Sequence, residues 1–163
     1  MGAGERVNRI LEHQGYREYL KKNEAAEKDR IFCRHDLGHF LDVARIAMIL
    51  NAGEGQGIDP ELIYGAALLH DIGRHLQYLD GTPHEEASAF LAGEILEDCG
   101  YTAEEKGRIV EAIGLHRCRE AEDMTGLNGL LYRADKLSRG CYACQAESQC
   151  NWKKEKKNLQ LIW

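Results

Sequence analysis

Apolar residues recur along this chain at the spacings of three and four that place them on one face of a helix. The pattern predicts helices near residues 5–22, 35–51, 60–72, 84–98, 103–116 and 127–138, and a helical tail from about residue 152. No segment shows the strict alternation of apolar and polar residues that is typical of a strand. The expected architecture is therefore all-α, a helical bundle of about six to seven helices.

Local signals place several helix ends. The sequence "DPE" at 59–61 offers an N-cap, a proline in the first turn and an acid at the positive end of the helix dipole. The pair "TP" at 82–83 repeats this device, and the helix that follows closes at Gly100. Thr102 and Glu105 have the spacing of a capping box for the next helix.

Five of the predicted helices carry an ionisable group on the apolar face. The groups are His39, His70 with Asp71 beside it, His84, His116 and Asp135. A single inward histidine is most often a hydrogen-bonded core residue. Burying so many polar groups without partners would cost several kcal/mol each, and two buried carboxylates need a compensating cation. A divalent metal would take neutral imidazoles and ionised carboxylates as ligands, so the joint pattern predicts a metal site.

The ordered set His39, His70-Asp71 and Asp135 resembles the signature of the HD-domain superfamily, helical metal-dependent phosphohydrolases. The stretch "HFLDVARIA" is similar to the helix of the first histidine, "AALLHDIGR" to the helix of the doublet, and "LYRADKLSR" to the helix of the last aspartate. The resemblance covers roughly residues 30–140. It implies a single HD domain over residues 1–163, with the segment 141–163 packed on it as a Cys-rich stretch and a C-terminal helix.

The resemblance also implies a ligand set. Members with two metals have two further histidines between the doublet and the last aspartate, as do the bacterial diadenosine-tetraphosphate hydrolases. The implied ligands are His39, His70, Asp71, His84, His116 and Asp135, with Asp71 bridging two ions of iron or manganese. His84 opens its helix, so an orientation toward solvent is the alternative for it. His35, one turn before His39, is expected to support the ligands rather than to bind metal.

Two ions of this kind would supply hydroxide from water near pH 7 and polarise a phosphoryl oxygen. Asp71, Arg74 and Lys136 are the expected catalytic residues, and Arg74, Lys136 and Arg139 the expected substrate-binding residues. If the helix continues through Gly73, the Arg74 guanidinium would lie over the doublet and clamp a phosphate. For Lys136 and Arg139 the alternative is a solvated side chain or a pair with one of the abundant glutamates.

The stretch "CYACQAESQC" places Cys141, Cys144 and Cys150 within ten residues. This spacing predicts a thiolate site for structural zinc or an iron–sulfur cluster. Such a site needs a fourth ligand, for which Cys118 is the first choice and Cys33 the reserve. The alternative is a set of reduced thiols that bind nothing.

Bulk composition narrows the function further. The 163 residues carry 21 Lys and Arg against 27 Asp and Glu, a formal net charge of −6. This charge argues against a general nucleic-acid or membrane partner but is compatible with a small anionic, nucleotide-like substrate. "MGAGERVNRI" does not have the pattern of a signal peptide, and no apolar stretch reaches the roughly 20 residues of a membrane helix. We therefore expect a cytoplasmic protein with reduced cysteines, and leave open whether it is a homodimer.

The sequence thus predicts an enzyme that uses metal-activated water to cleave a phosphate ester or anhydride of a nucleotide-like molecule. Two alternatives remain: a mixed-valent di-iron oxygenase of HD type, and a non-catalytic regulatory module that binds metal and nucleotide. His13 and His75 do not align with the apolar faces and are expected at the surface.

Overall fold

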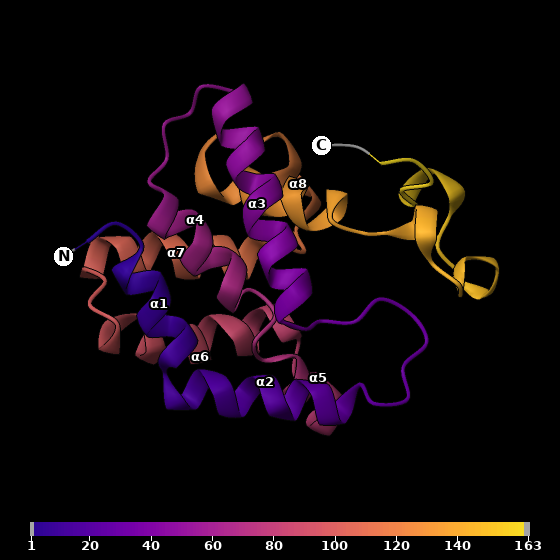
Figure 1. Ribbon diagram of the computed structural model, residues 1–163, viewed down its shortest axis with the longest axis horizontal. Helices are drawn as coiled ribbons and strands as arrows, with labels where there is room; N and C mark the ends of the chain where they lie inside the picture. The colour runs from indigo at the N-terminus through magenta and orange to yellow at the C-terminus, as the bar shows by residue number, and fades with distance from the viewer. Residues whose placement is uncertain (1, 162–163) are drawn as a thin grey trace.

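A computed structural model describes residues 2–161 of the chain, and its described part is all-helical, as predicted (Figure 1). The α-helices are α1 (Glu5–Glu12), α2 (Gln14–Ala26), α3 (Leu37–Gly53), α4 (Pro60–Leu69), α5 (Arg74–Asp80), α6 (His84–Asp98), α7 (Ala103–Leu115) and α8 (Gly126–Leu137). Short 3-10 turns follow as η1 (Arg119–Asp123), η2 (Cys141–Ala143), η3 (Glu147–Gln149) and η4 (Lys154–Lys156). No helix within residues 2–161 has both the length and the apolar character needed to cross a membrane.

Helix α4 lies at the centre of the bundle. It packs against α3, α7 and α8, while α6 covers α7 and α1 lies beside α4 (Figure 1). Seven of the ten residues of α4 are buried, which explains its high apolar content: neighbouring helices cover most of its surface. Tyr16 of α2 is fully buried, and its hydroxyl donates to the carbonyl of Leu68 (3.0 Å), which ties α2 to the end of α4.

The predicted caps at the start of α4 and α7 are present. Asp59 accepts a hydrogen bond from the backbone N–H of Glu61 (2.8 Å). Thr102 and Glu105 form the reciprocal capping box, with distances of 3.2 and 2.8 Å. At α6 the N-cap is Pro83, which offers no side-chain acceptor.

The boundaries differ from the prediction in three places. The segment 5–22 is two helices, because His13 leaves the helical conformation and caps α2 by accepting from the N–H of Tyr16 (3.3 Å). The predicted helix 60–72 ends at Leu69, and α5 follows after a turn. The predicted helical tail is wrong: the C-terminal strap, residues 140–161, contains only the short turns η2, η3 and η4 (Figure 1). Its run "KKEKK" is largely exposed and lacks an apolar stripe to pack.

Candidate metal centre

The His70-Asp71 pair lies in the turn between α4 and α5. The N–H of Ile72 donates to the carbonyl of Leu69 (3.2 Å), and the N–H of Arg74 donates to that of Asp71 (3.1 Å). The helix therefore does not continue through Gly73, contrary to the expectation from the sequence. The turn leaves the His70 side chain inaccessible and that of Asp71 only 4% exposed.

Gly73 allows α6 to approach this turn closely. A Cβ atom at Gly73 would lie 2.6 Å from the backbone nitrogen of Ser88 and 2.7 Å from the carbonyl carbon of Ala87. The N–H of Gly73 also donates to the Ser88 hydroxyl (2.9 Å). Only glycine fits here, and the close contact brings His84, the first residue of α6, next to Asp71.

Asn23 of α2 supports the same turn from behind. Its side-chain amide donates to the carbonyls of Asp71 (3.2 Å) and Ile72 (3.3 Å). Its side-chain oxygen accepts from the backbone N–H of His75 (2.8 Å). Asn23 is 1% exposed, so these buried backbone groups have no water to replace it.

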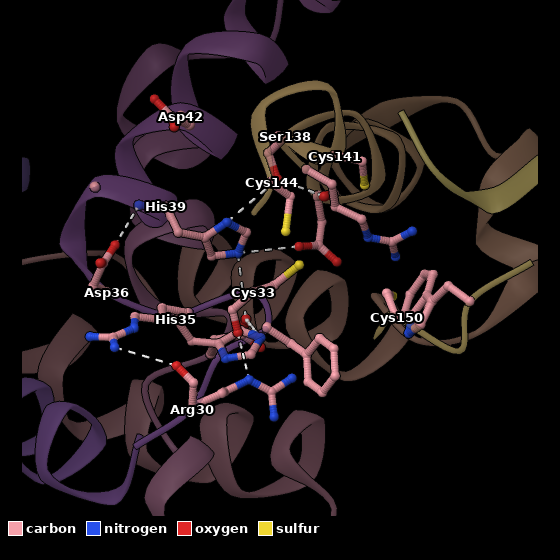
Figure 2. Close-up of a pocket in the computed structure, with 18 of the residues that line it drawn as sticks. Arg30, Cys33, His35, Asp36, His39, Asp42, Ser138, Cys141, Cys144 and Cys150 are labelled. Carbon is pink, nitrogen blue, oxygen red and sulfur yellow. Dashed lines mark hydrogen bonds and ion pairs between the residues drawn. The ribbon is translucent and has the colours of Figure 1, made fainter. Parts of the chain in front are cut away.

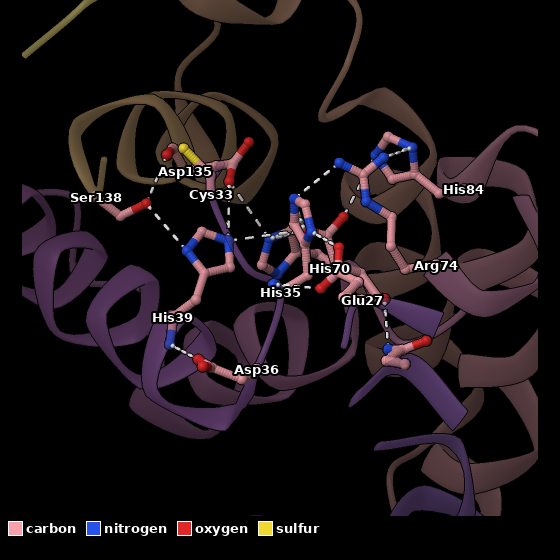
Figure 3. Close-up of polar contacts among 12 residues, drawn as sticks. Glu27, Cys33, His35, Asp36, His39, His70, Arg74, His84, Asp135 and Ser138 are labelled. Atoms are coloured by element: carbon pink, nitrogen blue, oxygen red, sulfur yellow. Dashed lines mark hydrogen bonds and ion pairs between the residues drawn. The ribbon is translucent and has the colours of Figure 1, made fainter. Parts of the chain in front are cut away.

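Six side chains converge on this turn in two groups that share Asp71 (Figure 3). The first group is His39, His70, Asp71 and Asp135, and the second group is Asp71, His84 and His116. Within each group the donor atoms lie within 4.8 Å of one another. The structure therefore brings together every residue that the sequence analysis assigned to the ligand set, and His84 points inward.

The two carboxylate oxygens of Asp71 face different groups. Oδ2 lies 3.2 Å from His70 Nε2 and 3.6 Å from His39 Nε2. Oδ1 lies 3.3 Å from His84 Nε2 and 3.4 Å from His116 Nε2. Asp135 completes the first group, with Oδ1 at 3.4 Å from Nε2 of both His39 and His70.

Hydrogen bonds behind the imidazoles set their tautomers. Nδ1 of His70 is 2.7 Å from the carbonyl of Ala67, and Nδ1 of His116 is 2.6 Å from that of Ile113. A carbonyl only accepts, so Nδ1 carries a proton in both rings and Nε2 faces the centre as the atom that a cation would bind in place of a second proton. At His84, Nδ1 lies 2.8 Å from Gln77 Oε1 and 2.9 Å from Arg74 NH1, so this outer nitrogen is engaged and Nε2 is left facing the centre.

The charge in the centre also fits a cation. Burial lowers the pKa of His70, but the carboxylates of Asp71 and Asp135 outweigh burial and raise it to about 10. In the protein alone, a proton on His70 thus balances the buried carboxylates. Burial, opposed by Asp71 and reinforced by the Arg74 guanidinium, lowers the pKa of His84 to about 3, so this imidazole is neutral.

Unsatisfied polar atoms point into the same space. His39 Nε2, His70 Nε2 and Asp71 Oδ1 are buried and have no hydrogen-bond partner among the described residues, although carboxylate or imidazole atoms lie close. Buried polar atoms of this kind are rare unless an ion or a water satisfies them. Imidazole and carboxylate donors around such a gap fit divalent metal, which agrees with the resemblance found in the sequence.

His35 supports the centre without belonging to either group. Its Nδ1–H donates to Glu27 (2.6 Å), and its Nε2 accepts from the Arg74 guanidinium (2.7 Å). Burial would raise the pKa of Glu27, but hydrogen bonds from His35 and Tyr78 lower it to about 2. A chain of contacts therefore runs from Glu27 through His35 to Arg74, and Arg74 lies beside His84 (2.9 Å between NH1 and Nδ1).

The two cations near Asp135 have different surroundings. The Lys136 amino group donates to Asp135 Oδ2 (2.9 Å) and to the carbonyl of His116 (3.2 Å), and it does not line the adjacent cavity. Lys136 therefore supports Asp135 from outside the cavity wall. Arg139 lines the cavity and stacks on Trp152, with 3.7 Å from its guanidinium carbon to the ring centroid.

A cavity of about 480 Å³ opens beside the centre (Figure 2). Its wall includes metal-centre residues, the loop 28–35 that precedes α3, and the C-terminal strap. Cationic residues on the wall are Arg30, Arg34, Arg74, Arg117, Arg139 and Lys157. Phe32 and Trp152 provide aromatic surface. The cavity therefore offers an anionic ligand both cations and a stacking face next to the candidate metal site.

Two residues lie elsewhere than the sequence analysis expected. Cys33 and Cys118 are both exposed, but only Cys33, the reserve choice, lines the cavity together with Cys141, Cys144 and Cys150. His75 is 9% exposed, because it stacks on Tyr19 with 5.6 Å between ring centroids and contacts Asn23.

Sequence reasoning did not identify Asn23, Glu27, Gln77 or Ser138, which support the ligands by hydrogen bonds. Ser138 lies 3.5 Å from His39 Nδ1 and donates its proton to the carbonyl of Asp135 (2.6 Å). Each is a single polar residue without a motif around it, so no pattern in the sequence pointed to it.

Comparisons with known proteins agree with this geometry. The model of the HD domain family matches residues 36–140. An uncharacterized protein of Clostridium beijerinckii is 48% identical over 159 residues, which are 98% of this chain and 99% of that protein. A crystal structure of a predicted HD superfamily hydrolase from an uncultured Thermotogales bacterium is similar with a TM-score of 0.63 and 25% identity, covering 94% of this chain and 87% of that one.

Ribonuclease Y of Enterococcus faecalis is a more distant relative. It is 31% identical over 126 residues, or 77% of this chain, but these residues make up only 22% of ribonuclease Y. The similarity therefore concerns a shared domain and not the whole of that enzyme.

Proposed function

This chain belongs to the HD domain family, and on that premise we propose that it is a metal-dependent phosphohydrolase acting on a phosphate ester or anhydride of a small nucleotide-like molecule. The observation that carries the proposal is the orientation of Asp71, whose two oxygens each face a separate group of imidazoles. A carboxylate shared in this way suits two divalent ions, and the mixed imidazole and carboxylate donors suit iron or manganese.

The ions, when bound, supply a metal-activated water near neutral pH and polarise the phosphoryl group. The protein itself fixes the positions of the ligand atoms and supplies the charged groups around them. His39, His70, His84 and His116 present Nε2 atoms from four different segments, and the supporting hydrogen bonds hold these atoms in place before substrate arrives. Lys136 holds the outer oxygen of Asp135, which keeps Oδ1 directed at the first group.

Arg74 is the residue best placed to bind the reacting phosphate. It lies between His35 and His84 at the boundary of the centre and the cavity. Its Nε–H is buried and has no partner among the described residues, so one donor is left for a phosphate oxygen. His35 and Gln77 fix the rest of the guanidinium, which reduces the conformational entropy lost on binding.

The wall of the cavity favours a nucleotide-like substrate over a polymer. A volume of about 480 Å³ is within the usual range for small-molecule sites. Trp152, already stacked by Arg139, offers a face to a planar base, and the arginines offer charge to phosphates. The formal charge of −6 would oppose a long nucleic acid. The name of ribonuclease Y supports phosphate-ester chemistry within the family. The substrate that its name indicates belongs to that enzyme and is not transferred to this chain.

The test is anaerobic hydrolysis of a panel of nucleoside phosphates and dinucleoside polyphosphates with Mn²⁺ or Fe²⁺. We expect release of phosphate or nucleotide, loss of the activity on chelation, and loss in His116→Ala but not in His13→Gln, which lies outside both groups. Dioxygen consumption by the reduced di-iron form would instead support an oxygenase. Thermal stabilisation by nucleotides without turnover would support a binding module.

A further inference from the structure

Four of the six cysteines lie on the wall of one cavity, next to the candidate metal centre but outside it. Cys141, Cys144 and Cys150 belong to the C-terminal strap, and Cys33 belongs to the loop 28–35. In Figure 2 the thiols of Cys33 and Cys144 point toward one another across the cavity. The other two cysteines are elsewhere: Cys99 is buried in the core and Cys118 is exposed before η1.

The two segments that carry these thiols do not contribute to the apolar core, and each is held at one end by hydrogen bonds, the loop at His35 and the strap at Asn158. No residue of 28–36 or 138–161 belongs to the apolar core cluster, and Ala146, although buried, lies outside it. The strap is attached to the end of α8, since Asn158 donates to the carbonyls of Lys136 (2.8 Å) and Arg139 (3.1 Å). Among the described residues, no hydrogen bond or ion pair joins the strap to the loop 28–35. Both segments do carry thiols on the wall of the same cavity.

The charges around the thiols favour a bound cation with several thiolates. Four thiolates around one divalent ion carry a net charge of −2, which needs compensation nearby. Arg139 interacts electrostatically with Cys33 and Cys141, and Lys157 with Cys150 and Cys141.

We propose that Cys33, Cys141, Cys144 and Cys150 bind a zinc ion that ties the strap to the loop 28–35 and completes the wall of the cavity. Two residues separate Cys141 from Cys144 and five separate Cys144 from Cys150, a spacing that lets one short segment supply three ligands. Soft thiolates select zinc, whereas the imidazole and carboxylate groups select harder ions, so one chain keeps two kinds of metal apart.

Zinc binding has to bring the thiols of the loop 28–35 and of the C-terminal strap closer together. Among residues 2–161, only the two groups around Asp71 bring three or more donor atoms within 4.8 Å of one another, so no three of the thiols lie that close together. His35 is held by Glu27 and Arg74, but residues 28–34 and the strap lie outside the apolar core, so they can shift without repacking the helices. Zinc binding is therefore coupled to closure of this wall, as metal binding and local folding commonly are.

The experiment is a titration of the full-length, metal-free, reduced protein with Co²⁺ as a spectroscopic substitute for Zn²⁺. We expect thiolate-to-cobalt charge-transfer absorption in the near ultraviolet together with the intense visible bands of a tetrahedral site, and displacement of both by Zn²⁺. The groups around Asp71 contain no sulfur and cannot produce the charge-transfer absorption. The readout is optical, so a failure of the hydrolysis proposal would leave this result unaffected.

Cysteine-to-serine variants test which thiols bind the zinc ion. Cys33→Ser and Cys144→Ser should each lower zinc affinity by more than the roughly 10–100-fold seen when a supporting residue is lost, with unchanged helix content by circular dichroism. Cys118→Ser is the matched control and should keep the full absorption. The proposal is overturned if the wild-type protein shows no charge-transfer absorption, if the absorption persists in Cys33→Ser, or if the cysteines hold iron with acid-labile sulfide or form a disulfide instead.

Discussion

The side-chain amide of Asn23 donates to the backbone carbonyl of Asp71 with 3.2 Å between nitrogen and oxygen. A residue of α2 thereby holds the turn that carries the carboxylate shared by both ligand groups. The contact is buried and joins two residues that are far apart in sequence. It therefore links the position of helix α2 to the geometry of the candidate metal centre.

Asn23→Ala tests this link. The change leaves the carbonyls of Asp71 and Ile72 and the N–H of His75 buried without partners, so the free energy of unfolding should fall by about 1–3 kcal/mol. Metal affinity should fall roughly 10–100-fold, as for other residues that support ligands. Chemical denaturation and metal titration measure the two effects. Asn8→Ala, which removes an exposed bond to the carbonyl of Gly4, should change neither, and equal effects in both variants would contradict the assignment.

Replacing the shared carboxylate should affect both ions together. Asp71→Ala removes the ligand common to the two groups, so elemental analysis should find both ions lost. His116→Ala removes a ligand of the second group only, so the first ion should remain. Activity in each variant should fall by more than about 100-fold. Retention of two ions in Asp71→Ala would show that the groups do not share this ligand.

The close approach of α6 to the turn predicts a second coupling. Gly73→Ala places a Cβ against the backbone of Ala87 and Ser88, and the overpacking should cost about 1–3 kcal/mol of stability. Since α6 begins at His84, the second group should lose metal before the first. Gly107→Ala on α7 meets no atom within 4 Å and should be neutral or stabilise by about 0.5–1 kcal/mol. Full occupancy of both ions in Gly73→Ala would refute the coupling.

The buried Glu27 predicts a pH dependence of stability. Its pKa in the folded protein is about 2, below the value of about 4.3 for an unfolded chain. A lowered folded pKa means that Glu27 stabilises the protein fully above pH 4.3 and that this contribution is lost as the pH falls through about 2. Glu27→Gln should therefore flatten the fall of unfolding free energy between those pH values, measured by urea denaturation. Glu24→Gln, at an exposed position, should keep the wild-type slope.

The helices and the ligand set could be predicted because each depends on a repeated local pattern. His39, His84, His116 and Asp135 all lie in line with apolar neighbours, and the polar set stands out against them. The turn after Leu69 was not predictable from that pattern, since Ile72 continues the apolar period and no proline interrupts it. The contacts at the helix end are tertiary: the carbonyl of Leu68, which would accept from the N–H of Ile72 in a continuing helix, accepts from the Tyr16 hydroxyl of α2.

The fourth ligand of the cysteine site shows a different limit of prediction from the sequence. Cys118 is close in sequence to His116, but the backbone leaves the centre after His116 and Cys118 does not line the cavity. Cys33 lines the cavity from the loop before α3, more than a hundred residues before the other three cysteines on its wall. The tail from about residue 152 has apolar residues around a basic run, which predicts a helix, yet Trp152 and Leu159 remain exposed and only a short turn forms.

The ligands around Asp71 are distributed along the chain from His39 to Asp135. During synthesis, the second group can be completed once His116 has left the ribosome, whereas the first must wait for Asp135. A chain interrupted before Asp135 would therefore offer an incomplete set of donors to the first ion. Binding at the first group would thus report that the ribosome has delivered the chain through Asp135.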